Sequence, residues 1–290
     1  MPHLIACTDG SYYASGVYEA AAWIANRTHI SIKLLHVLDQ KQEQPDDVDL
    51  SGALHLEASR ELFAELAALD TARARLLEVK ARALLETAVK YLRGKDARSV
   101  ATVLKQGTLV DALAELEREP KAQMVVIGKR GDYAAYDHQH LGAKLERVIR
   151  ACRRPILVAN QTFRPIKRVL IAFDGAASSE KVIAYALDQS LLKGLDLHVL
   201  SVGAPRSPID QALAKAADRL QNAGYNVTSV LRQDNAEGDI EQLITDYVRD
   251  EQMDMLMLGA YGHARQRHLI VGKTTTSLVR LCNIPLLIFK

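Results

Sequence analysis

The sequence has little of what marks several specialised protein classes. Its three cysteines, Cys7, Cys152 and Cys282, are too few for a disulfide framework and lack metal-ligand spacing. No apolar run is long enough to span a bilayer, and MPHLIACTDG at the start lacks the pattern of a signal peptide. The formal net charge of +2 is too small to argue for a nucleic-acid partner, because nucleic-acid modules usually carry a basic face. We therefore expect a cytoplasmic protein with buried thiols and without a membrane or nucleic-acid partner.

The most informative feature that is present is an internal duplication. The segment GAKLERVIRACRRPILVAN (142–160) resembles GKTTTSLVRLCNIPLLIFK (272–290), and MVVIGKRG (124–131) resembles MLMLGAYG (255–262). Near the start of each copy, LIACTDG (4–10) resembles LIAFDG (170–175). The same blocks in the same order at a long period indicate two copies of one domain. We place the copies at 1–160 and 167–290, joined through QTFRPIK.

Each copy alternates short apolar runs with amphipathic stretches. In the second copy we predict strands at 168–173, 195–202, 227–231, 255–258 and 285–289, and helices at 178–192, 208–223, 237–250 and 274–282. Strands that are apolar on successive residues are typical of a parallel sheet covered on both faces. Strand–helix alternation therefore predicts an α/β fold, with two tandem, doubly wound, five-stranded parallel sheets.

The first copy carries a helical insertion at about 49–93, rich in Ala, Leu, Glu and Arg. We predict a packed helical hairpin with Asp70–Thr71 near its turn, and the alternative is an arm that binds a partner or forms a dimer. At the opposite end of each copy, Ile156–Ala159 and Leu286–Phe289 are apolar edge strands. We expect them to pair with each other, so that one chain imitates a dimer of single domains; a homodimer of the chain also stays possible.

Ligands of open parallel sheets bind beyond the carboxyl ends of the strands, where the strand order reverses. One second-copy loop expected there is GAYGHARQRHLIVGKTTT (259–276), which leads into a helix. Its glycines allow a polyphosphate to approach the backbone, and the helix start offers N–H groups to an anion. Lys273 adds a charge, and Thr274 and Thr275 add hydroxyls for phosphate or a hydrated metal. The competing interpretation is a glycine-rich connection with solvated basic residues.

This loop is not a Walker A motif. That motif needs a glycine five residues before Gly272, where Arg267 stands, and it follows the first strand of a domain.

A first strand ending in Asp, followed late by G-x2-G-x9-G before the last helix and strand, resembles the universal stress protein family over both copies. The resemblance implies a Rossmann-like fold related to adenine nucleotide alpha hydrolases, with ATP, possibly with Mg, as the ligand. By this resemblance Asp174 and backbone near Val199 recognise adenine, and the loop holds ribose and phosphates. The implied loop residues are Gly259, Gly262, Gly272 and Thr274, and Lys273 stands where the family usually has Ser or Thr.

The first copy departs further from the family pattern. Its candidates are Asp9, Val37 (matched to Val199), Gly128, Gly131 and Gly142. Ala143 replaces the hydroxyl residue, and Asp132 and Asp137 add negative charge, opposed by Lys129 and Arg130. We therefore expect a degenerate site here, although a shifted nucleotide site stays open. We expect His138 and His140 to be ordinary polar residues of the loop and not metal ligands.

No nucleophile–base pair or pair of carboxylates accompanies the glycine loop, so the sequence shows no catalytic group. Asp9 and Asp174 stand at strand ends, where an aspartate can simply cap the next helix. The resemblance implies at most weak ATPase activity. Two functions remain: a nucleotide-dependent stress-response regulator or adaptor with an unidentified protein partner, or a scaffold of the same fold that binds no nucleotide. An ATP-consuming enzyme is disfavoured, because neither ACTDGS nor AFDGAA has the Ser-Gly-Gly-rich loop of the related ligases.

Overall fold

The computed structural model describes residues 1–38, 56–97, 99–130, 143–233, 239–261 and 272–290. The first copy comprises β1 (His3–Cys7), α1 (Ala14–Thr28), β2 (Ser31–Leu38), α2 (Leu56–Arg93), β3 (Val100–Gln106), α3 (Leu109–Leu116), β4 (Ala122–Gly128), α4 (Ala143–Ala151) and β5 (Ile156–Ala159). The second comprises β6 (Arg168–Ala172), α5 (Ala177–Asp188), η2 (Ser190–Leu192), β7 (Asp196–Val202), α6 (Pro208–Asn222), β8 (Asn226–Arg232), α7 (Ile240–Asp250), β9 (Met255–Gly259), α8 (Lys273–Leu281) and β10 (Leu286–Phe289). The predicted elements of the second copy are all present; the first helix ends early, at Asp188, and a 3₁₀ turn follows.

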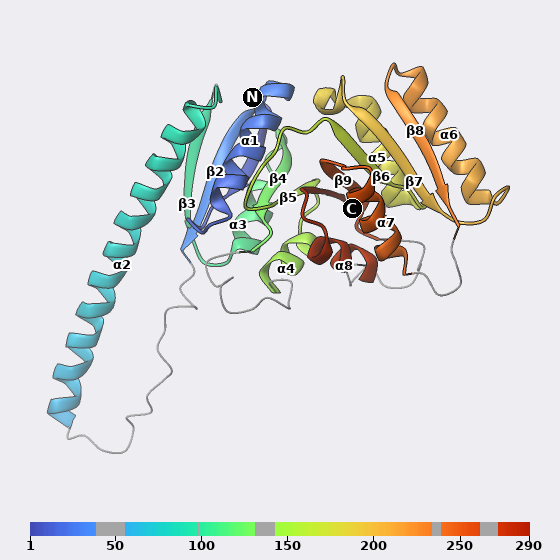
Figure 1. Ribbon diagram of the computed structural model, residues 1–290. Helices are drawn as coiled ribbons and strands as arrows, with labels where there is room; N and C mark the ends of the chain where they lie inside the picture. Colours follow the sequence, from blue (N-terminus) through green and yellow to red (C-terminus); the bar gives the residue numbers. More distant parts are fainter. Residues whose placement is uncertain (39–55, 98, 131–142, 234–238, 262–271) are drawn as a thin grey trace.

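All the strands form one sheet, in the order β3-β2-β1-β4-β5-β10-β9-β6-β7-β8 (Figure 1). Each copy is a parallel half-sheet, and the halves join through β5 and β10, the two strands that we expected to pair; their pairing is antiparallel. Leu157 lies opposite Leu287, its counterpart in the duplication, and both are buried. A pseudo-two-fold axis therefore passes through this pair, so the chain imitates a symmetric dimer.

Helices cover both faces of the sheet, and a hydrophobic core lies under each layer. Buried residues of α1, α2, α5 and α6 pack in one core, and those of α3, α4, α7 and α8 pack in the other. Both cores continue from one copy into the other. All three cysteines are buried and free, and burial raises the pKa of the Cys7 thiol to about 12. Among the described helices, none is long and apolar enough to cross a membrane.

The helical hairpin predicted in the first copy is wrong, because α2 is one continuous helix from Leu56 to Arg93. Asp70 and Thr71 lie in its middle, and the Thr71 hydroxyl donates to the Ala67 carbonyl at 2.8 Å instead of opening a turn. Residues 56–93 contain neither Gly nor Pro, so nothing in them breaks a helix made of strong helix formers. Composition identified a helical segment, and the absence of a breaker decides that it does not fold back.

The C-terminal part of α2 is the counterpart of α6. The amide of Ala97 donates to the Leu92 carbonyl as that of Tyr225 donates to the Leu220 carbonyl. Leu85, Ala88 and Leu92 are buried in the same pattern as Leu213, Ala216 and Leu220. On this alignment Lys80 corresponds to Pro208, the first residue of α6. The insertion is therefore an N-terminal extension of the crossover helix, residues 56–79.

Two lysines bind the copies together by capping helices across the join. Lys129, directly after β4, is buried and donates from Nζ to the Arg280 and Cys282 carbonyls at 3.0 and 2.8 Å. These carbonyls end α8 of the other copy, where a positive charge is favourable. At the end of β10, Lys290 donates to the Arg150 carbonyl near the end of α4. Burial lowers the pKa of the Lys129 ammonium.

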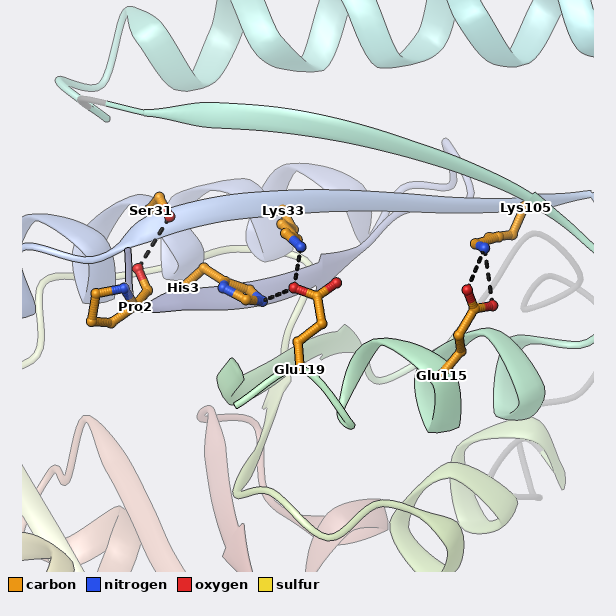
Figure 2. A network of polar contacts seen from close by, with 7 residues as sticks. All are labelled: Pro2, His3, Ser31, Lys33, Lys105, Glu115 and Glu119. Atoms are coloured by element: carbon orange, nitrogen blue, oxygen red, sulfur yellow. Dashed lines mark hydrogen bonds and ion pairs between the residues drawn. The ribbon is translucent and has the colours of Figure 1, made fainter. Parts of the chain in front are cut away.

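A polar network closes the amino ends of β1 and β2 in the first copy (Figure 2). Lys33 donates to Glu119, and His3 Nε2 lies 3.5 Å from the same carboxylate, Oε2. The His3 ring is buried, and its Nε2 has no hydrogen-bond partner among the described residues. Burial, together with the charge of Lys33, lowers the pKa of His3 below its ordinary value. This network lies at the opposite edge of the sheet from the candidate site.

Candidate functional site

The strand order reverses beside β1 in the first copy and beside β6 in the second. β6 lies between β7 and β9, and the helices that follow β6 and β9 cover opposite faces of the sheet. The loops after β6, β7 and β9 therefore meet at the carboxyl edge, where ligands of doubly wound sheets bind.

Asp174 follows β6 and organises the start of α5. Its Oδ1 accepts from the Ala176 amide at 2.9 Å and from the Ser179 hydroxyl at 2.6 Å. Gly175 has φ +74°, a left-handed conformation that glycine adopts without a Cβ penalty, and Gly10 in the first copy has φ +77°. The Asp-Gly pair therefore makes a tight turn that fixes the orientation of the carboxylate at the sheet edge.

Gly259 ends β9 where α5 and β9 come closest. A Cβ at Gly259 would lie 2.2 Å from Ser178 Oγ and 2.7 Å from Ser178 Cβ, so only glycine fits there without a shift. The Ser178 hydroxyl donates to the Tyr261 carbonyl and so ties α5 to the chain after β9. Sequence reasoning missed Ser178 and Ser179, although two serines just after an Asp-Gly turn are a signal of a helix start that needs hydroxyl partners.

Helix α8 begins beside this contact. The Gly272 amide donates to the Ala260 carbonyl at 3.1 Å, and Gly272, as the N-cap, gives the helix no side-chain cap. Lys273 is exposed and Thr274 is half-buried. Thr275, which we expected to offer its hydroxyl to a ligand, is buried and donates to the Gly259 and Ala260 carbonyls at 3.2 and 3.3 Å. That hydroxyl is therefore used to hold α8 against β9.

Val199 does not lie at the end of its strand. It pairs with Ile171 and Ser229 inside β7, and its side chain is fully buried. The match of Val199 to Val37 is also wrong. The Thr8 amide donates to the Leu35 carbonyl, and the Phe173 amide donates to the Leu200 carbonyl in the same way, so Leu35 corresponds to Leu200. This register makes Val202, the last residue of β7, the counterpart of Val37 in β2.

The same register reveals a repeated contact that sequence analysis did not identify. His36 Nδ1 lies 2.7 Å from the Thr8 carbonyl oxygen, and Ser201 Oγ donates to the Phe173 carbonyl at 2.7 Å. Each side chain joins its second strand to the residue just before the strand-end aspartate. The residue types differ, so no sequence match could have revealed the equivalence.

In the first copy the corresponding edge is more crowded. Asp9 is exposed, and its Oδ1 accepts from the Ser11 amide at 2.9 Å. Leu84 of α2 packs directly on Gly10, the residue after Asp9, since a Cβ at Gly10 would lie 2.3 Å from Leu84 Cδ1. The counterpart of Leu84 in α6 is the smaller Ala212. Lys129, expected to oppose the acidic loop residues, is instead buried against α8.

Gly128 ends β4 in contact with α1, as Gly259 does with α5: a Cβ at Gly128 would lie 2.9 Å from Tyr13 Cβ. Gly131, Gly142 and Gly262 lie outside the described residues, as do His138 and His140. Within the described ranges, no three His, Cys, Asp or Glu side chains come together as metal ligands.

The fold and its edge loops define a class of protein, the tandem doubly wound α/β proteins with a candidate ligand site at the strand-order reversal of each copy. The sequence model of the Universal stress protein family matches residues 1–160 and again residues 165–290, so the chain belongs to that family.

A relative supports this membership over the full length, and two solved structures share the fold. A universal stress protein of Synechocystis sp. (strain ATCC 27184 / PCC 6803 / Kazusa) is 37% identical over 294 residues, covering 100% of both chains. A universal stress protein of Archaeoglobus fulgidus DSM 4304 shares the fold with a TM-score of 0.73 at 17% identity, covering 99% of this chain and 98% of that one. A protein of Pseudomonas aeruginosa UCBPP-PA14 has a TM-score of 0.61 at 16% identity, covering 100% and 93%.

Proposed function

We propose that the second copy binds ATP or a closely related adenine nucleotide at its carboxyl edge, and that the protein is a cytoplasmic, nucleotide-dependent regulator or adaptor in a stress response. The observation that carries this proposal is the start of α8. Gly272 leaves the first turn without a side-chain cap, and Lys273 is exposed beside it. Amides at a helix start attract an anion, and a lysine adds a full charge. Family membership makes a nucleotide the expected anion.

The residues around this helix start fit the rest of a nucleotide. Gly259 has no side chain where the backbone turns, and Gly272 lies at the other end of the same loop. Asp174, held by Ala176 and Ser179, is the candidate for adenine recognition, with Val202 rather than Val199 at the end of the neighbouring strand. Thr274 is the candidate hydroxyl for phosphate or for Mg that accompanies it.

Calorimetric titration with Mg-ATP tests the site, with two lysine variants matched in charge. Lys273→Gln removes the proposed phosphate contact, and we expect affinity to fall by about 10- to 100-fold, the range for a hydrogen bond to a charged group. Lys215→Gln removes a charge from an exposed position on α6 and is expected to leave affinity unchanged. Equal affinity of the two variants, or no binding by the wild type at millimolar Mg-ATP, would reject the proposal.

A second function, a scaffold that binds no nucleotide, is favoured by one observation in the first copy. Leu84 packs on the turn after Asp9, where a base would otherwise approach, so we propose that this copy lacks a working site. An Asp9→Ala variant should then bind Mg-ATP with the same stoichiometry as the wild type, and Asp174→Ala should lose binding. A scaffold alone would show no binding in any of the three proteins. We expect phosphate release from ATP to be weak at most.

A further inference from the structure

The extension of α2 is long enough to leave the body of the protein. Residues 56–79 continue the helix beyond the part equivalent to α6, which adds about 36 Å at 1.5 Å per residue. Figure 1 shows the N-terminal half of α2 running past the sheet, away from the other labelled helices and strands. We call residues 56–79 the arm. The second copy has no counterpart, because α6 starts at Pro208 behind the Ser207 cap.

The arm carries an apolar stripe that nothing in the described chain covers. Four of its large side chains are strongly exposed, Phe63 62%, Leu66 43%, Leu69 65% and Leu76 69%, and Leu62 is half-exposed. Positions 62, 66, 69, 73, 76 and 80 follow the alternating spacing of four and three residues found in coiled coils, with Leu at four of them. A single helix in water gains little stability by itself, so a stripe of this kind indicates a partner helix.

The charges on the arm and on the turn that follows it show which helix fits. Before Thr71, the described side chains of the arm include the acidic Glu65 and Asp70. From residue 72 to residue 82 the helix is basic: it carries one acid, Glu78, which forms an ion pair with Arg82, and the basic residues are Arg73, Arg75, Lys80 and Arg82. Two such helices attract when they run antiparallel, because each acidic half then lies beside a basic half. A parallel pair would place like charges together.

We propose that the arms of two copies of this chain pair as an antiparallel coiled coil and make a homodimer. Centred near Thr71, the pairing places Leu66 against Leu76 of the partner subunit, and Leu69 against Arg73 of the partner subunit. Phe63 flanks the first of these layers. Because each chain has one arm, the two-fold contact closes on itself and produces a dimer instead of a filament.

Light scattering after size-exclusion chromatography tests the dimer on the full chain. We expect twice the 32.0 kDa chain mass for the wild type and a single chain mass for the double variant Leu66→Glu/Leu69→Glu. Ala64→Glu introduces one acidic side chain on the opposite side of the arm and should remain dimeric, since Glu is a good helix former. A monomeric wild type across the micromolar range, or a double variant that stays dimeric, would overturn the proposal. A thermal melt of the double variant checks that its two domains remain folded.

Disulfide crosslinking tests the orientation, because the three native cysteines are buried and leave the introduced thiols as the reactive ones. We expect Leu66→Cys mixed with Leu76→Cys to form a crosslinked dimer on mild oxidation. Each variant alone should crosslink poorly, because position 66 does not face itself in an antiparallel pair. Efficient crosslinking of Leu66→Cys alone would show parallel arms and contradict the charge argument.

Discussion

Replacing Gly259 with alanine tests the close contact that shapes the candidate site. The new Cβ would lie 2.2 Å from Ser178 Oγ, 2.7 Å from Ser178 Cβ and 3.0 Å from the Ser178 carbonyl carbon. The last two atoms belong to the rigid start of α5, so relief requires the helix to move away from β9. We expect that movement to weaken the Ser178 bond to the Tyr261 carbonyl as well.

Overpacking of a well-packed contact lowers the free energy of unfolding by about 1–3 kcal/mol. Replacement of glycine raises it by about 0.4–1 kcal/mol, because the unfolded chain has less conformational entropy. We therefore expect a net loss of about 1–2 kcal/mol in the free energy of unfolding and a fall of roughly 2–4 °C in Tm. The first copy offers a matched control. At Gly128 the nearest atom, Tyr13 Cβ, is 2.9 Å away, so Gly128→Ala should cost less than half as much.

Urea denaturation of the single and double variants measures the contact directly. Ser178→Gly removes both close side-chain atoms, so the double variant with Gly259→Ala should show a favourable coupling of about 1 kcal/mol in a double-mutant cycle. Ser178→Ala keeps the Cβ and should recover less. Additive losses in the cycle, or a Gly128→Ala cost equal to that of Gly259→Ala, would refute the steric reasoning.

Two further predictions concern the join and the opposite edge of the sheet. Lys129→Met leaves the Arg280 and Cys282 carbonyls without their donor and should lower the free energy of unfolding by about 2 kcal/mol; an unchanged urea midpoint would show that the cap contributes nothing. The lowered pKa of His3 means that the unfolded chain binds a proton more readily, so stability should fall as pH drops below the ordinary value of 6.5. Between pH 7.5 and 5.5, His3→Gln should therefore lose less stability than the wild type in the same denaturation assay; equal losses would assign the pH dependence to other groups.

The sequence alone was enough to establish the duplication, the α/β class and the pairing of β5 with β10. These features depend on local patterns: apolar strands covered on both faces, amphipathic helices between them, and matching blocks at a long period. An apolar edge strand at the end of each copy needs a partner, and the other copy's edge strand supplies one. Asp174, Gly259, Gly272 and Lys273 could likewise be placed at one edge, because the carboxyl ends of parallel strands share that edge.

Tertiary structure decided what the local pattern left undetermined. The register of β7 against β6 made Val202, and not Val199, the counterpart of Val37, since side-chain alternation does not fix which residues of two similar strands correspond. Lys129 looked like a loop charge, but the approach of the second copy buried it at the end of α8. The helical composition of residues 56–93 was evident from the sequence, whereas only the structure showed that they form one continuous helix. The contact of Lys129 with α8 has no signature in either segment alone, which is why only the folded structure could decide it.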